Sequence, residues 1–131
     1  MRKNVTANDP LIAGIKKRLL DVITEFMRAR PNQVATYLPA IKETCARTFT
    51  GDPTALVKEA ALKLLEEIID HYPMSVLAKI IDSTDLVSRL LDTIKHQRPS
   101  ASVKGTIWTL VGLCHKKFGD DVQDLLVESQ D

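Results

Sequence analysis

The stretches VKEAALKLLEEI (residues 57–68) and VKGTIWTLVGLC (residues 103–114) carry one amphipathic pattern twice, 46 residues apart. A third stretch, IKKRLLDVITEF (residues 15–26), begins 42 residues before the first and matches both. Positions 1, 5, 8, 9 and 12 are apolar in all three stretches, and position 2 is always lysine. Steps of three and four residues place side chains on one face of an α-helix. The three stretches therefore predict three equivalent amphipathic helices.

Repeats of helix pairs at spacings of about 40–47 residues are typical of HEAT and armadillo arrays. The stretch GDPTALVKEAALKLL (residues 51–65) also has the local pattern of the second helix of a HEAT unit: an aspartate in the turn, Val-Lys, a small residue and a leucine. We therefore expect an all-α fold, a HEAT/armadillo-like superhelix (solenoid) of about three repeats. Residues 1–131 are expected to form a single helical-repeat domain, with inner helices near residues 11–29, 54–71 and 102–117.

Capping and proline signals predict where the helices begin and end. Asp9 followed by Pro10 predicts the start of the first helix. Pro31 predicts its end near Arg30, because the residue before a proline is disfavoured in the helical conformation. Gly119 is expected to end the helix of the third stretch.

The segment that follows the first helix leaves two alternatives open. Asn32 can cap a helix that runs to about Phe49, and Pro39 marks either a kink in it or the true start of its regular part. Further helices are expected over residues 74–81, from about residue 82 to residue 94, and from residue 120 onward. No segment has the pattern of a strand.

The first helix lacks a preceding partner and the last lacks a following one. A helix pair in such an array cannot bury its apolar face alone. We therefore expect the chain to be a segment of a longer solenoid, with apolar surface at both ends. The alternative is a small free-standing protein.

Composition is that of a soluble globular protein, with 44% hydrophobic and 27% charged residues. We expect neither a secretory signal nor a membrane span. The net charge is +1, but residues 1–47 carry nine Lys/Arg against four Asp/Glu, so the excess of basic residues lies in the first third. The two cysteines, Cys45 and Cys114, lie on apolar helical faces, which favours a reducing compartment.

The sequence contains no pattern that predicts catalysis or a bound cofactor. Metal-ligand spacings of Cys and His and glycine-rich phosphate loops are absent from it. His115 adjoins Cys114, but neighbours in a helix point about 100° apart, so they form no nucleophile–base pair. We expect both cysteines to be core residues, and Trp108 to fill the core between repeats because it occupies the same position as Leu20 and Leu62. Catalytic residues, metal ligands, cofactors and a small-molecule substrate are all expected to be absent.

Basic residues are the candidates for partner recognition. The lysines at position 2 would form a row along a stacked array, where they either pair with acids in the turns, such as Asp52 and Asp9, or contact phosphates or an acidic partner. A second cluster lies on the first helix, either as a solvated face or as a contact surface. The candidate contacts with DNA or an acidic partner are Lys16, Lys17, Arg18, Arg28, Arg30, Lys58 and Lys104.

Three further stretches carry a resemblance to a known family: YLPAIKETCARTFTGDPTALVKEAALKLLEEII, LVSRLLDTI and VKGTIWTLVGLCHKKF. In order and separation they resemble the N-terminal helical-repeat region of the DNA-dependent protein kinase catalytic subunit, over roughly residues 18–125. The resemblance implies a non-catalytic segment of a large nuclear serine/threonine kinase of the phosphatidylinositol-3-kinase-related type. That region helps to encircle DNA ends and meets the Ku heterodimer in non-homologous end joining. No single DNA-contacting residue can be transferred, because the family has no short motif here.

Two main functions follow from these patterns. The first is a HEAT-repeat scaffold of a DNA-repair kinase, with the rest of the solenoid, Ku and double-stranded DNA as partners and a nuclear location. The second is a stand-alone HEAT or armadillo adaptor for protein partners in transport, cytoskeletal or assembly roles, with a cytoplasmic location. A helical-repeat DNA glycosylase is a third class, but its groove would need aromatic residues and an acid that we do not find.

Overall fold

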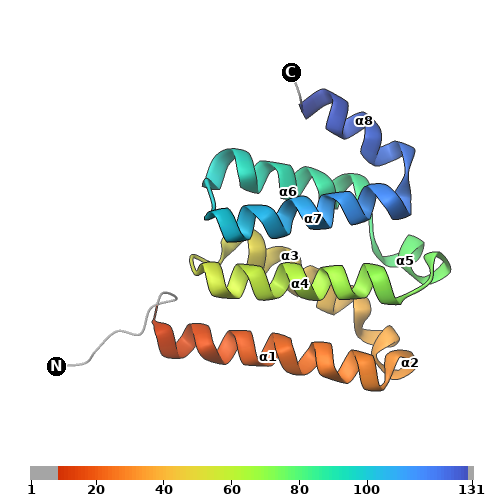
Figure 1. The fold of residues 1–131 in the computed structure, drawn as a ribbon. Coiled ribbons are helices and arrows are strands. Elements are labelled where there is room, and N and C mark those ends of the chain that lie inside the picture. Colours follow the sequence, from red (N-terminus) through yellow and green to blue (C-terminus); the bar gives the residue numbers. More distant parts are fainter. Residues whose placement is uncertain (1–8, 130–131) are drawn as a thin grey trace.

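The structure, a computed structural model, describes residues 9–129, except for the side chains of residues 120, 121, 128 and 129. Every element in this range is a helix, so the all-α prediction is confirmed (Figure 1). The elements are α1 (Pro10–Ala29), α2 (Pro31–Val34), the 3-10 helix η1 (Ala35–Tyr37), α3 (Leu38–Gly51), α4 (Ala55–His71), α5 (Met74–Ile80), α6 (Ser83–Gln97), α7 (Ala101–Phe118) and α8 (Asp120–Ser129).

The long helices form two layers. Helices α1, α4 and α7 lie side by side in one layer, here called the inner layer, with α4 in contact with both neighbours (Figure 1). Helices α3 and α6 form the outer layer, in which α3 packs on α4 and α6 packs on α7. Helix α8 contacts α6 and α7. The three stretches that repeat in the sequence are thus the three inner-layer helices.

Helix α1 begins and ends where the capping signals predict. The Oδ1 atom of Asp9 accepts a hydrogen bond from the backbone N–H of Leu11 at 2.8 Å, and Pro10 occupies the first turn, where its missing N–H costs nothing. At the other end the N–H of Arg30 donates to the carbonyl of Phe26, and the helix stops before Pro31.

The connection between α1 and α3 differs from one of its predictions. Asn32 lies inside the short helix α2, and Arg30 occupies its N-cap position without a side-chain hydrogen bond, so the prediction that Asn32 caps a helix was wrong. Pro39 lies in the first turn of α3. Of the two alternatives, Pro39 therefore marks the start of the regular helix, because proline fits the first turn of a helix but not its interior.

The later helices begin and end close to their predicted positions. Ser100 caps α7 by accepting a hydrogen bond from the N–H of Val103 at 3.3 Å, and Gly119, with φ of 68°, ends α7 as expected. Short loops, residues 52–54 and 98–100, join each outer helix to the inner helix that follows it. This arrangement repeats the same unit twice: α3–α4 and α6–α7.

Trp108 does not fill the core as the repeat pattern predicted. Leu20 and Leu62, at the equivalent position of α1 and α4, are buried, whereas Trp108 is 45% exposed. The buried residues of α1 face α4, its main neighbour, so this position points from each inner helix toward the next one. In the part of the chain that the structure describes, no inner helix follows α7, and Trp108 is left in solvent.

Candidate interaction surfaces

The inner layer carries an open groove of about 910 Å³ that runs across α1, α4 and α7. Residues 59, 63, 66 and 70 of α4 line it. Because they recur at helical spacing, they form one face of α4, opposite to the buried positions of that helix. Its charged lining residues are Asp21, Glu25, Glu59, Glu66, Glu67, Asp70, Lys17, Arg28, Lys63 and Lys116. Acidic residues thus outnumber basic ones in the groove.

Carboxylates crowd together at the α4 wall of this groove. Partial burial raises the pKa of Glu66, Lys63 opposes this shift, and the negative charges of Glu67 and Asp70 add to it, so that the pKa lies above its usual value. A positive charge that entered the groove would relieve this repulsion.

The basic cluster on α1 is engaged in ion pairs. Lys17 Nζ lies 2.6 Å from the Oδ2 atom of Asp21, one turn further along α1. Arg18 pairs more loosely with Glu25, at 3.7 Å. Their free charge is therefore reduced by acids on the same helix, although solvent exposure keeps such pairs weak.

Arg28 makes the cross-helix contact of the cluster. Its guanidinium donates to the carboxylate of Glu67 on α4, and this hydrogen bond raises the pKa of Arg28 above its usual value. Arg30, at the end of α1, is exposed. The structure thus places Lys17 and Arg28 in the groove beside acids.

Lys16 pairs with an acid of a turn, as one of the two alternatives predicts. Its Nζ atom lies 2.8 Å from the Oδ2 atom of Asp52, in the loop between α3 and α4. The Oδ1 atom of Asp52 accepts from the backbone N–H and the hydroxyl of Thr54 at 2.9 and 2.6 Å. Burial raises the pKa of Asp52, but the hydrogen bonds from Lys16 and Thr54 outweigh it, so the pKa lies below its usual value.

The second lysine of the row repeats this contact with a different partner. Lys58 donates to the side-chain carbonyl of Gln97 at the end of α6, and the Nε2 atom of Gln97 donates to the carbonyl of Thr50 at 2.6 Å. Each of these two lysines therefore reaches the end of the next outer helix. Lys104, the third, is exposed at the edge of α7, whereas Asp9 caps α1.

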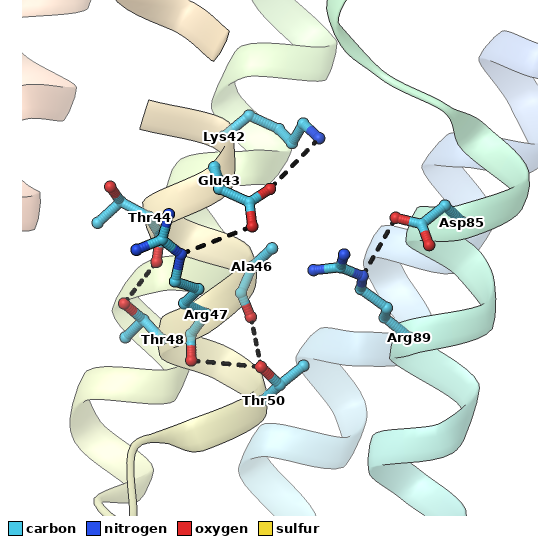
Figure 2. A network of polar contacts seen from close by, with 9 residues as sticks. All are labelled: Lys42, Glu43, Thr44, Ala46, Arg47, Thr48, Thr50, Asp85 and Arg89. Atoms are coloured by element: carbon cyan, nitrogen blue, oxygen red, sulfur yellow. Dashed lines mark hydrogen bonds and ion pairs between the residues drawn. The ribbon is translucent and has the colours of Figure 1, made fainter. Parts of the chain in front are cut away.

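The outer layer is polar on its solvent side (Figure 2). Glu43 lies 3.6 Å from Arg47 and 3.8 Å from Lys42 on α3, and Arg89 lies 3.1 Å from Asp85 on α6. All of these pairs join residues of the same helix. They keep the outer faces of α3 and α6 polar and contribute little stability, roughly 0.3–0.5 kcal/mol for a pair one turn apart.

Both cysteines are core residues, as predicted. Cys45 and Cys114 are free and fully buried, and burial raises the pKa of each thiol to about 12. The Nε2 atom of His115 lies 2.8 Å from the Oε1 atom of Gln123 on α8. Thiols that hold their protons this firmly are poor nucleophiles at neutral pH.

Two kinds of feature are absent from residues 9–129. Within them, no group of three or more His, Cys, Asp or Glu side chains could hold a metal ion. No described helix is both long and apolar enough to cross a membrane.

Sequence reasoning missed the acidic groove and the role of Gln97. The signal for the groove was present: the acidic residues of α4 at positions 59, 66 and 70 share the polar face of that helix. Gln97 carried no such signal, because it replaces a turn acid with an amide and lies at a helix end that periodicity cannot place.

Comparison with known proteins identifies a family. A family model described as "DNA-PKcs, N-terminal" matches residues 1–125. No curated protein and no solved structure matched. The match of this family model spans nearly the whole chain and all three repeated helices. The family model represents the N-terminal part of DNA-PKcs and not its kinase domain. The chain belongs to the DNA-PKcs N-terminal family, as the resemblance of its repeated helices predicted.

Proposed function

We propose that this chain is a non-catalytic HEAT-type scaffold, a segment of the solenoid of a DNA double-strand-break repair kinase. The observation that carries the proposal is the family match over residues 1–125, which covers three inner-layer helices with one repeated pattern. The parent protein would be a nuclear serine/threonine protein kinase, and this part of it would hold partners in place and not phosphorylate them.

The surfaces of the chain support a role in holding partners. The groove across α1, α4 and α7 is open and lined with charges of both signs, and both thiols are buried. Charged, open faces of a helical layer suit contact with another protein more than enclosure of a small substrate. The partners we propose are the rest of the solenoid, the Ku heterodimer and double-stranded DNA.

Direct contact with DNA is the part of the proposal that most needs an experiment. Arg18 and Arg30 are the best probes, because both are exposed and their replacement should leave the packing of α1 intact. The variant Arg18→Gln/Arg30→Gln and the wild type are titrated with a labelled short duplex at several salt concentrations. Lys79→Glu on α5 is the control, because it lowers the net charge by the same amount.

Contact with phosphates predicts weaker binding by the double variant and a salt slope smaller by about one for each phosphate that the variant no longer neutralises. Equal affinity and slope for the wild type, the double variant and the control would reject the DNA contact. Binding of purified Ku, measured with the same three proteins, tests the protein-scaffold part separately.

A second candidate is a stand-alone adaptor for protein partners in transport, cytoskeletal or assembly roles, in the cytoplasm. The excess of carboxylates in the groove favours it, because such a groove would attract a basic peptide. The length of the natural open reading frame separates the two: thousands of residues favour the kinase scaffold, and about the length of this chain favours the adaptor.

A further inference from the structure

Helix α1 carries a stripe of large apolar side chains that face solvent. The stripe consists of Leu11, Ile15, Leu19, Val22 and Phe26, which are 70, 49, 60, 41 and 54% exposed. They recur at steps of three and four residues and so form one face of the helix. Isolated exposed apolar residues are common, but a continuous stripe along a whole helix marks an interaction surface.

The repeat identifies what covers this face in the other inner helices. Positions 1, 5, 8 and 12 of the pattern are Ile15, Leu19, Val22 and Phe26 in α1. The same positions are fully or almost fully buried in the other two helices: Val57, Ala61, Leu64 and Ile68 in α4, and Val103, Ile107, Leu110 and Cys114 in α7. Helix α4 has α3 packed on it and α7 has α6 packed on it. Helix α1 lacks an outer helix of this kind among the described residues.

A hollow beside the stripe points to the same missing element. It has a volume of about 590 Å³ and lies between α1 on one side and α2, η1 and α3 on the other. Ile23 and Phe26 line it from α1, and Tyr37 and Ile41 line it from the other side. In the outer layer α3 contacts α6 as well as α4. A helix seated on the α1 stripe would in the same way lie against α3 and fill this hollow.

We propose that the α1 stripe is the seat of an amphipathic helix of the α3 and α6 type, contributed by the larger polypeptide and lying antiparallel to α1. This inference rests on the proposed function, since it assumes that the chain is part of a longer array. The stripe carries Leu19 and Phe26 where α4 has Ala61 and Ile68. Because interiors pack to a constant density, the bound helix carries small residues opposite these two side chains.

The chain itself supplies probes for this seat. A labelled peptide of residues 83–97, the α6 helix, is titrated into the full chain, together with a peptide in which Leu90→Glu destroys its apolar face. The receptor variant is Leu19→Glu/Val22→Glu, and Trp108→Ala on the opposite edge is the matched control. These positions are chosen by their exposure in the structure. Leu90 of the peptide is buried in the folded chain, whereas Leu19, Val22 and Trp108 of the receptor are exposed.

The proposal predicts that the α6 peptide binds the wild type and the Trp108→Ala control equally, with little dependence on salt. The Leu19→Glu/Val22→Glu variant should keep its helical circular dichroism and bind at least about tenfold more weakly. The Leu90→Glu peptide should fail to bind any of them.

Three results would overturn the proposal. The first is that neither the α6 peptide nor an α3 peptide (residues 38–51) binds at concentrations up to about 1 mM. The second is equal binding of the peptide by the wild type and the Leu19→Glu/Val22→Glu variant, and the third is that the wild type is a dimer whereas this variant is a monomer. The last would assign the stripe to a second copy of the chain. Any of these would leave the Ku and duplex measurements unaffected, so failure of the seat and failure of the scaffold function are distinguishable.

Discussion

Lys16 and Asp52 lie 36 residues apart in the chain, yet the ammonium of the first is 2.8 Å from a carboxylate oxygen of the second. The contact joins the first inner helix to the loop that begins the second. Lys58 makes the equivalent contact with Gln97 one repeat later. Two of the three lysines that recur at one position of the sequence, Lys16 and Lys58, therefore hold neighbouring helices in register.

Replacing Asp52 should destabilise the fold more than replacing another paired acid. Its carboxylate is buried and accepts from Lys16 and from Thr54, so Asp52→Ala is expected to lower the free energy of unfolding by about 1–2 kcal/mol. Asp21→Ala removes an exposed pair within one helix and should cost less than about 0.5 kcal/mol. Urea unfolding of both variants makes the comparison; equal losses would mean that the contact does not join the repeats.

The same carboxylate should make the stability depend on pH in the acid range. The pKa of Asp52 is lower in the folded chain than its usual value of about 3.9. Its contribution is therefore complete above the unfolded pKa and is lost as the pH falls through the folded one. Melting temperatures recorded from neutral pH downward should fall less steeply at acid pH for Asp52→Asn than for the wild type. Parallel curves would contradict the lowered pKa.

Trp108 should behave as a solvent-exposed residue. Acrylamide is expected to quench its fluorescence efficiently in the folded chain, with little increase on unfolding. Trp108→Ala should change stability by about 0.5 kcal/mol. Leu62→Ala, at the equivalent and fully buried position of α4, should cost about 2–5 kcal/mol. Strong protection of Trp108 from acrylamide would show instead that another molecule covers this edge.

The two cysteines should be unreactive until the chain unfolds. Burial raises the pKa of each thiol to about 12, so hardly any thiolate exists at neutral pH. Titration with a disulfide reagent should detect neither thiol in buffer and both in denaturant. Rapid labelling of Cys114 alone in the native chain would mean that a helix packed on α7 opens readily.

Sequence periodicity was sufficient to predict the positions of the inner helices, and local signals predicted most of their ends. It placed α1, α4 and α7 because each repeats one apolar face, and Asp9, Pro31 and Gly119 are strong local stop and start signals. Periodicity assigns a residue to a face but cannot tell whether anything packs on that face. Leu19 and Trp108 therefore followed the pattern of buried positions and yet lie in solvent.

The surface features depend on contacts between elements that are distant in sequence. Gln97 joins Lys58 and Thr50 through an amide, and no charge pattern could predict that arrangement. The groove becomes acidic because carboxylates of α1 and α4 meet across it, and their juxtaposition follows from packing and not from the local sequence.

The bonds between repeats also determine how the molecule yields to force. The hydroxyl of Tyr72, directly after α4, donates at 2.8 Å to the carbonyl of Pro31, at the start of α2 and two residues beyond α1. Together with the contact between Lys16 and Asp52, this bond joins α1 and α4 near both of their ends. Helix α4 is bonded to the next repeat near its N-terminal end, through Ser102 on α7 and Gln97 on α6. Among the described residues, the polar bonds between α4 and α7 are made by Glu59, and none joins the C-terminal ends of these two helices. Under a mechanical load, α1 and α4 would therefore move together as one unit. Helices α4 and α7 would separate first at their C-terminal ends and stay joined near the N-terminal end of α4.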